Sequence, residues 1–219
     1  MIDSIVQLLN TTRIFVIITF IVSLLFLNLK SDQNKLLLSI LSVSFITESI
    51  AVILICIDSS EHIGLLYSLS VLFHNSLWLL LLVTSISSSE SLKYIVVGFI
   101  LFAIYNLYFL EGPVKFNYLS FIAGALMYII VFIYQSFAQL KQENFPLFQS
   151  NTYILLFAPI LFFFGMSFMF GFRSSTITSI IVFDNVKLYT FINEFVNIIY
   201  YLSIIFYIYK EKKKIKHEQ

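Results

Sequence analysis

Charged residues are scarce in this sequence. They make up only 11% of the 219 residues, while hydrophobic residues make up 59%, and a soluble domain carries about 25% charged residues. This imbalance excludes an ordinary water-soluble domain, so the lipid bilayer is the first partner that the composition predicts. The length then leaves room for one domain, without a separate catalytic or nucleic-acid-binding module.

Cysteine and histidine are nearly absent, which limits redox and metal chemistry. The single cysteine, Cys56, has no partner for an internal disulfide. A zinc hydrolase of the ceramidase-like seven-span type needs several histidines, including a pair four residues apart on its last helix. Asn193 and Asn197 stand where that pair would fall. We therefore expect no metal and no cofactor, and we assign no catalytic residue.

Signatures of several other functions are also missing. The sequence has no glycine-rich phosphate loop and no nucleophile elbow. A retinal-binding photoreceptor needs a lysine within the last apolar run, but Lys187 and Lys210 lie at its ends. The C-terminal lysines are not interleaved with aromatic residues, so we expect no nucleic-acid partner. These absences favour binding or transport over catalysis.

Seven apolar runs, each close to the length of about 20 residues that crosses a bilayer, fill most of the chain. The first has no basic segment before it and no small-residue cleavage site after it, so we expect it to remain as a span. The sequence thus predicts an all-α, seven-transmembrane-helix bundle forming one domain over residues 1–209. The predicted spans are Arg13–Leu29, Leu36–Ile57, Ile63–Ile86, Tyr94–Leu110, Asn117–Phe137, Asn151–Phe172 and Leu188–Tyr209.

Basic residues are distributed unevenly over the connectors. An N-terminus outside the cell places nine of the thirteen lysines and arginines on the cytoplasmic side, and the positive-inside rule favours that orientation. Five of the nine lie in residues 210–219, which we interpret as a basic cytoplasmic tail attracted to anionic lipid headgroups. The nine are Lys30, Lys35, Lys93, Lys141, Lys210, Lys212, Lys213, Lys214 and Lys216; the other four are Arg13, Lys115, Arg173 and Lys187.

The sixth span and the connector after it contain the features most typical of a moving part. Pro159 lies inside that span and is expected to kink it near Gly165. The connector Arg173–Lys187 is long and carries several isoleucines. It is the best candidate for a lid over the mouth of the bundle.

The last span carries one continuous polar stripe. Its polar residues recur at steps of three and four, so they share one helix face. An acid at mid-helix costs about 2.5 to 3.5 kcal/mol when it faces lipid, and the stripe is therefore expected to face other helices or a hydrated cavity. It comprises Thr190, Asn193, Glu194, Asn197, Tyr200 and Tyr201.

Polar groups in other spans fall at similar depths. A helical rise of about 1.5 Å per residue places Glu48 about 18 Å from the inner edge of a core about 30 Å thick, and His74 about 16 Å from the outer edge. Asn106 falls in the outer half of its span. We therefore predict a polar pocket in the outer half of the bundle. Its expected ligand-binding residues are Glu48, His74, Asn75, Asn106, Glu194, Asn197 and Tyr201.

A structural role for these groups is the alternative. Polar side chains also hold transmembrane helices together by hydrogen bonds, each contributing about 0.6 kcal/mol. This alternative stays open for Asn75, Asn106 and the tyrosines, and His74 alone equally fits a satisfied histidine of the bundle. For Glu48 and Glu194, the cost of burying an acid favours a ligand or ion site.

Three short segments carry a resemblance: Phe45–Glu48, His74–Asn75 and Asn193–Tyr201. With them the chain is similar to small stand-alone seven-span bacterial membrane proteins, and more loosely to the membrane half of bacterial seven-transmembrane receptors with intracellular signalling modules. This resemblance implies a location in the bacterial inner membrane. No kinase, cyclase or phosphatase segment follows Tyr209, so any signal is expected to pass to a separate partner protein.

Three functions fit these observations. The first is a receptor-like membrane sensor that binds a small polar or amphipathic molecule in the pocket and acts in signalling through a separate protein. The second is a proton- or cation-coupled transporter of small solutes, in which Glu48 and Glu194 exchange protons across the midplane. The third is a structural subunit of a larger membrane complex, with the polar stripe as its docking face.

Overall fold

The computed structural model describes residues 10–86, 92–173, 176–183 and 186–218, and within these ranges the all-α prediction is confirmed. The long helices are α2 (Thr11–Phe26), α3 (Asp32–Cys56), α4 (Ile63–Ile86), α5 (Lys93–Tyr105), α6 (Tyr118–Lys141), α8 (Asn151–Gly171) and α9 (Leu188–Glu218). The short elements are the 3₁₀ turns η1 (Ser60–His62) and η4 (Thr176–Ser179), the π-helical segment η3 (Asn106–Leu110), helix α7 (Phe145–Gln149), and strands β1 (Ile181–Phe183) and β2 (Val186–Lys187).

Within the described residues, six helices are long and apolar enough to cross a membrane: α3, α4, α5 with its continuation η3, α6, α8 and α9. Their outward faces carry exposed large hydrophobic side chains such as Leu101, Ile130 and Phe164, which suit a lipid environment and not water. The chain is therefore a multi-pass membrane protein. The remaining apolar helix, α2, has 16 residues, slightly fewer than the about 17 to 25 of a typical span.

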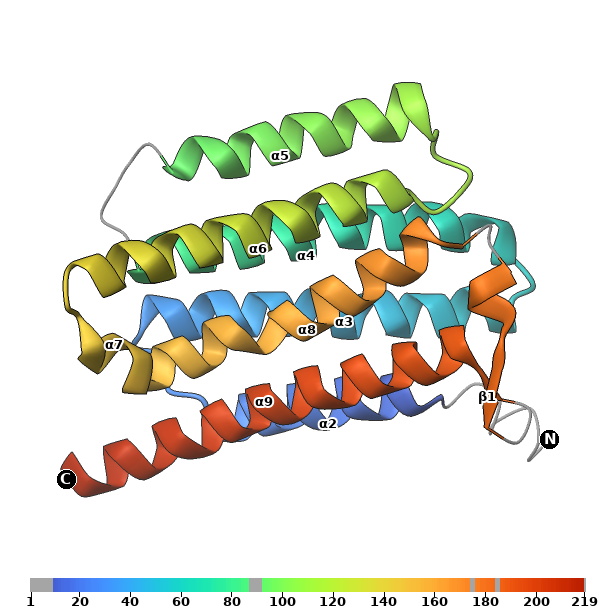
Figure 1. Ribbon diagram of the computed structural model, residues 1–219. Helices are drawn as coiled ribbons and strands as arrows, with labels where there is room; N and C mark the ends of the chain where they lie inside the picture. The colour runs from blue at the N-terminus through green and yellow to red at the C-terminus, as the bar shows by residue number, and fades with distance from the viewer. Residues whose placement is uncertain (1–9, 87–91, 174–175, 184–185, 219) are drawn as a thin grey trace.

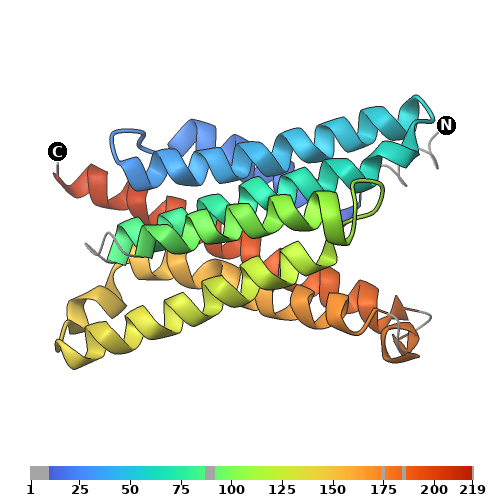
Figure 2. The same ribbon diagram turned by 90° about the horizontal axis from the view of Figure 1, so that it is seen from above.

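The long helices other than α5 form a closed ring. α2 packs on α3, α3 on α4, α4 on α6, α6 on α8, α8 on α9, and α9 returns to α2. α5 packs on α4 and α6 from outside this ring and stands apart at the edge of the bundle in Figure 1. Seen from above, α6 and α8 run at an angle to each other (Figure 2). The ring order could not be inferred from the sequence pattern, and it decides which polar residues meet.

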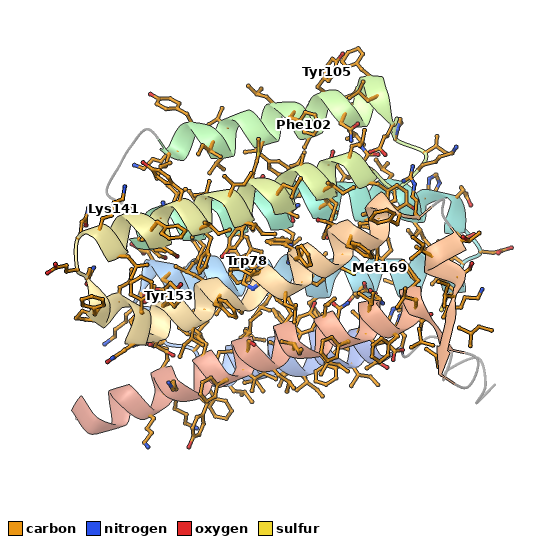
Figure 3. All side chains as sticks on the ribbon, in the orientation of Figure 1. Trp78, Phe102, Tyr105, Lys141, Tyr153 and Met169 are labelled. Carbon is orange, nitrogen blue, oxygen red and sulfur yellow. The ribbon has the colours of Figure 1, made fainter. Side chains whose placement is uncertain are left out.

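Aromatic side chains fill the middle of the ring. Trp78 and Tyr200 are almost completely buried, as are Tyr128 and Phe163. Trp78 meets the rings of Tyr128 and Tyr200 edge to face, at centroid distances of 6.1 and 6.0 Å, a geometry that aromatic pairs prefer. Figure 3 shows Trp78 inside the bundle, whereas Tyr105 of α5 lies at its edge.

The connector predicted as a lid forms a small hairpin at the start of α9. β1 and β2 pair antiparallel, and the backbone N of Leu188 donates to the backbone O of Ile180 at 2.8 Å. The hairpin packs on α9, at the same end of the bundle as the start of α2 (Figure 1). Residues 174–175 and 184–185 of the predicted lid lie outside the described ranges.

The sequence predicts a kink inside the sixth span, near Gly165, and places the end of the seventh span at Tyr209. α8 runs as one helix through Pro159. α9 does not end at Tyr209 but extends to Glu218, because Lys and Glu are good helix formers and nothing in residues 210–218 breaks the helix. The basic tail is thus a continuation of the last helix.

Candidate functional site

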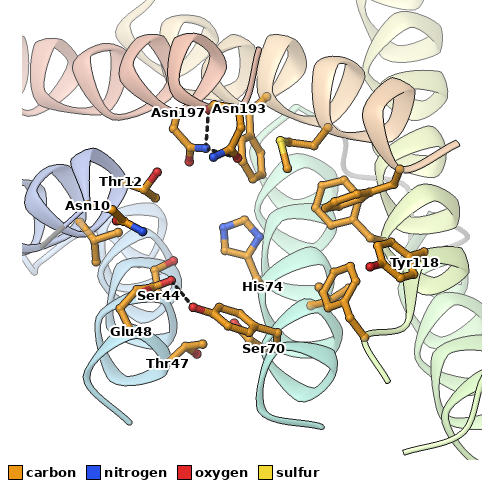
Figure 4. A pocket seen from close by; sticks show the side chains of 18 of the residues that line it. Asn10, Thr12, Ser44, Thr47, Glu48, Ser70, His74, Tyr118, Asn193 and Asn197 are labelled. Atoms are coloured by element: carbon orange, nitrogen blue, oxygen red, sulfur yellow. Dashed lines mark hydrogen bonds between the residues drawn. The ribbon is translucent and has the colours of Figure 1, made fainter. Parts of the chain in front are cut away.

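A cavity of about 380 Å³ lies inside the ring, in the half that contains the start of α2 and the hairpin. Its lining comes from the six ring helices and the residues just before them, and α5 contributes none of it. Figure 4 shows polar side chains of α2 and α3 on one side and the aromatic ring of Tyr118 on the other, with His74 between them. The volume lies within the range of about 300 to 1,000 Å³ that is usual for small-molecule sites. Four of the predicted site residues line it: Glu48, His74, Asn197 and Tyr201.

Glu48 lies in the polar wall, and Arg13 balances its charge. The Nε of Arg13 donates to Oε2 of Glu48 at 2.8 Å, and the hydroxyl of Tyr67 donates to Oε1 at 3.0 Å. The side chains of Arg13 and Glu48 are only 10% and 19% exposed, so salt and water screen the pair little. Both carboxylate oxygens therefore have a partner.

The start of α2 positions Arg13 beside the middle of α3. The side chain of Asn10 accepts a hydrogen bond from the backbone N of Arg13 at 2.9 Å, which satisfies one of the free N–H groups of the first turn. Sequence reasoning placed Arg13 at the outer end of the first span and missed its role. The signal was present, because a carboxylate inside a membrane helix requires a cationic or hydrogen-bonding partner.

A chain of hydrogen bonds connects α4, α9 and α6 beneath the cavity. Trp78 Nε1 donates to the hydroxyl of Tyr200 at 3.0 Å, and this hydroxyl is 3.2 Å from His74 Nε2. Because an indole can only donate, the hydroxyl keeps its own proton free for His74 Nε2; in that tautomer the ring proton is on Nδ1, 3.4 Å from Asn75 Oδ1. Asn75 Nδ2 donates in turn to the backbone O of Phe121 at 3.4 Å. His74 is thus held from both sides by uncharged partners.

α9 turns part of its polar stripe toward the cavity. Asn193, Asn197 and Tyr201 follow each other at steps of four and all line it, as expected for one helix face. Asn197 Nδ2 donates to the backbone O of Asn193 at 2.8 Å and to its Oδ1 at 3.2 Å. α9 approaches α8 closely at Gly165, where a Cβ would lie 2.7 Å from Cγ1 of Val196.

The wall opposite the ion pair is aromatic. Phe121 and Phe162 meet at a centroid distance of 5.9 Å, and Phe121 and Phe170 at 5.0 Å, both edge to face. The guanidinium of Arg173 lies over the ring of Tyr118 at 3.7 Å from its centroid, within the range of a cation–π contact. Tyr118 lines the cavity, and the exposed Arg173 covers its ring just after the end of α8.

Glu194 does not lie where we expected it. It is exposed and is not a lining residue of the cavity. Glu194 lies about 100° around the helix from Asn193 and about 60° from Asn197, at the edge of the stripe, and the structure leaves it exposed outside the cavity lining. It lies near the start of α9, about 9 Å along the helix, from where a long side chain reaches the polar edge of a bilayer. The expectation that Glu48 and Glu194 share one hydrated space is wrong.

Asn106 also lies apart from the cavity. It is on η3, outside the ring, and its Nδ2 donates to Glu111 Oε2 at 2.9 Å and to Ser120 Oγ at 2.8 Å. The same oxygen of Glu111 accepts from the backbone N of Leu119 at 2.9 Å, so this cluster caps the start of α6. Asn75 sits behind His74 and is not a lining residue either. Both asparagines connect helices, which was the alternative left open for them.

The same ring helices form a second polar cluster at the opposite end. The hydroxyl of Tyr207 donates to Asn34 Oδ1 at 2.6 Å. Asn151 Nδ2 donates to the backbone O of Tyr207 at 3.2 Å and to Glu211 Oε1 at 2.7 Å. These four residues, Asn34, Asn151, Tyr207 and Glu211, join α3, α8 and α9, and we call them the bridging cluster.

Within the described ranges, no three His, Cys, Asp or Glu side chains gather into a group that could hold a metal ion. No family model, curated protein or solved structure matches the chain. The functional interpretation therefore depends on the geometry of the cavity and on what α9 connects to it.

Proposed function

We propose that this protein is a membrane sensor that binds a small polar or amphipathic molecule in the cavity. The observation that carries this proposal is the cavity itself, a space of about 380 Å³ between six helices. It combines an aromatic wall with a few convergent polar groups, among them Glu48, His74 and Asn197. This combination is typical of small-molecule sites, where apolar contacts supply affinity and polar groups fix orientation.

α9 supports a signalling role because it connects the cavity with the opposite end of the ring. Asn197 and Tyr201 line the cavity, Tyr200 belongs to the central hydrogen-bond chain, and Tyr207 and Glu211 belong to the bridging cluster. A ligand that shifts the first half of α9 acts on the bridging cluster through one rigid element. We infer that the extended end of α9 presents the output to a separate partner protein.

We further propose that α2 is a seventh span, with the N-terminus outside and the C-terminus in the cytoplasm of a bacterial inner membrane. Ile18, Ile21 and Leu25 form an exposed apolar face on α2, which suits contact with lipid. The lysine-rich end of α9 then lies on the cytoplasmic side, in agreement with the positive-inside rule.

The native cysteine tests this orientation. Cys56 is exposed at the end of α3, at the cavity end of the bundle. A membrane-impermeant maleimide should label it in intact cells, whereas a cysteine introduced as Gln219→Cys in a Cys56→Ser background should react only after the cells are opened. The reverse pattern would overturn the proposed orientation.

The fluorescence emission of Trp78 can report ligand binding in the cavity. It is the only tryptophan of the chain, is fully buried, and is one hydrogen bond from Tyr200, which contacts His74 in the cavity wall. With the protein in nanodiscs, a library of small polar and amphipathic compounds should contain members that change Trp78 emission saturably. Ser70→Phe, which fills the cavity from α4, should abolish the change. The matched control Ser49→Phe, on an exposed site of α3, should retain it.

Two outcomes would overturn the sensor proposal. If Ser70→Phe responds like the wild type, binding occurs outside the cavity. If proteoliposomes accumulate the bound compound under a proton or sodium gradient, the protein is a transporter. If a compound binds, a second measurement tests whether α9 transmits the change. A fluorophore is attached through Lys213→Cys in the Cys56→Ser background, and its emission should also change when the cavity is filled.

A further inference from the structure

Most hydroxyl side chains of α3 and α4 are bonded within their own helix. Each donates to the backbone O four residues earlier, an arrangement that is usual for serine and threonine in transmembrane helices. The distances run from 2.6 to 3.3 Å, and the donors are Ser39, Ser42, Ser44 and Ser49 on α3 and Ser68, Ser76 and Thr84 on α4. This bond occupies the hydroxyl proton of each side chain.

Two hydroxyls that line the cavity do not follow this pattern. Thr47 of α3 and Ser70 of α4 have no hydrogen-bond partner among the residues that the structure describes. Thr47 is next to Glu48 in the chain and Ser70 is one turn after Tyr67, whose hydroxyl donates to Glu48 Oε1 at 3.0 Å. The two unpaired hydroxyls therefore lie close to one level of the bundle. Thr47 is only 6% exposed, and a buried hydroxyl without a partner costs free energy.

A third unpaired group faces the cavity from α9. Both printed bonds of the Asn197 side chain come from its Nδ2 and end on Asn193, and its Oδ1 accepts none from any described residue. Asn197 is 6% exposed and lines the cavity. Figure 4 shows it on the other side of His74 from Thr47 and Ser70. Unpaired polar groups thus meet the cavity from three helices.

An occupant that pairs with all three groups carries hydrogen-bonding groups at several points of its body. It has to donate as well as accept, because a hydroxyl does both and Asn197 Oδ1 only accepts. A single polar head at one end of a molecule reaches only one side. The volume of about 380 Å³ exceeds the about 150 Å³ that holds one six-membered carbon ring, and Phe121 and Phe162 give part of the wall an apolar surface. A ring with hydroxyls at its edge and C–H groups on its faces matches this lining.

We propose that the cavity binds a polyhydroxylated six-membered ring, such as a monosaccharide, and that Thr47, Ser70 and Asn197 determine its specificity. The hydroxyls of the ring donate to Asn197 Oδ1 and exchange hydrogen bonds with Thr47 and Ser70, while its C–H groups pack on Phe121 and Phe162. This inference rests on the proposed binding function and adds the class of ligand for the same cavity.

A panel of methyl pyranosides tests the ligand class. Methyl glucoside, galactoside, mannoside and xyloside differ in the arrangement or number of their hydroxyls, whereas cyclohexanol has a six-membered ring with a single hydroxyl. None of them absorbs where tryptophan is excited, so Trp78 emission reports their binding to the protein in nanodiscs. The part of the signal that Ser70→Phe removes is the binding in the cavity. We expect at least one pyranoside to bind at least about tenfold more tightly than cyclohexanol.

Conservative variants test the assigned residues. Thr47→Val and Ser70→Ala each remove one unpaired hydroxyl, and each should lower the affinity for the tightest pyranoside by about three- to tenfold, the effect of one hydrogen bond. Thr47→Ser retains the hydroxyl and should bind like the wild type. The matched controls Thr84→Val and Ser76→Ala remove hydroxyls that bond within α4 and do not line the cavity, so they should leave the affinity unchanged.

Monodeoxy analogues of the same pyranoside identify the hydroxyl that each side chain contacts. One analogue should bind to Thr47→Val and to the wild type equally well, because the hydroxyl of the ligand and its partner are then both absent. A second analogue should behave in this way with Ser70→Ala and a third with Asn197→Leu. A side chain that acts only through the shape of its helix would instead weaken every analogue alike.

The outcomes separate this inference from the function on which it rests. If no pyranoside binds more tightly than cyclohexanol, but cyclohexanol or another compound gives a signal that Ser70→Phe removes, the ligand class is wrong and the binding function remains. If the variants weaken binding no more than their controls do, or weaken every monodeoxy analogue alike, the assigned residues are wrong. If neither the panel nor the compound library gives a signal that Ser70→Phe removes, the inference and the proposed binding function both fail.

Discussion

The two polar ends of the helix ring use the same helices with opposite results. In the bridging cluster, Tyr207, Asn34, Asn151 and Glu211 bond to one another across α3, α8 and α9 at distances from 2.6 to 3.2 Å. At the other end, α3 and α9 contribute polar groups of similar kind, but these face a space of about 380 Å³. One end is closed by its own hydrogen bonds and the other is hollow.

This difference separates packing from function. Hydrogen bonds between transmembrane helices contribute about 0.6 kcal/mol each, which is sufficient reason for the bridging cluster to exist. The hollow end has no such explanation, because protein interiors are normally close-packed and unfilled space lowers stability. An ion pair between Arg13 and Glu48 at the edge of that space adds a desolvation cost. We therefore attribute function to the hollow end and structural support to the closed one.

The largest effect is expected from breaking the ion pair. Arg13→Met leaves Glu48 without its cation in a site that is only 19% exposed, and should lower the free energy of unfolding by about 2 to 4 kcal/mol. Unfolding in mixed micelles measures this change. The double variant Arg13→Met with Glu48→Met should recover most of the loss, because both charges of the pair are then removed from the site. A loss no larger than that of Arg173→Met, at an exposed arginine, would show that the pair is not buried.

A smaller effect is expected where α9 approaches α8 at the hollow end. In Gly165→Ala the new Cβ meets Val196 Cγ1 at 2.7 Å, so α9 must shift, at a cost of about 1 to 2 kcal/mol. The shift moves Asn197 and Tyr201, which line the cavity. The affinity of a compound that changes Trp78 emission should therefore fall as well. The control is Gly98→Ala on α5, where nothing lies within 4 Å. It should lower neither the free energy of unfolding nor the affinity for the compound. Equal effects at both glycines would contradict the ring arrangement.

Removing one hydroxyl at each end compares the two regions directly. Tyr207→Phe leaves Asn34 Oδ1 without its donor at a buried site and should cost about 1 kcal/mol. Tyr67→Phe removes a donor to Glu48 at the cavity wall, where water takes its place and Arg13 remains, so the cost should be less than about half of that. Only Tyr67→Phe should alter the binding of a compound that changes Trp78 emission. If Tyr67→Phe proves the more destabilising, the hollow end is not hydrated.

Local features of the fold were predictable from the sequence, and the neighbours of each helix were not. The predicted span Ile63–Ile86 matches α4 at both ends, because the length of an apolar run is a property of contiguous residues. Asn106 was misplaced because no local pattern shows that α5 lies outside the ring. Arg13 was missed for the same reason, since its partner Glu48 is 35 residues away. Periodicity identifies a polar stripe but not which edge of it turns inward, which is why Asn197 was placed correctly and Glu194 was not.

The smallest effect is expected for Glu194→Gln, and it sharpens the contrast between the two acids. Glu194 is exposed and lies outside the cavity lining, so its neutralisation should change the free energy of unfolding by no more than about 0.5 kcal/mol. The ligand-induced change in Trp78 emission should stay that of the wild type. The isosteric change Glu48→Gln, measured in parallel, should alter both the free energy of unfolding and the change in Trp78 emission. Glu194→Gln would contradict this expectation if it abolished the ligand-induced change in Trp78 emission. In that case α9 rotates on binding and brings this carboxylate to the cavity, and the hollow end contains two functional acids instead of one.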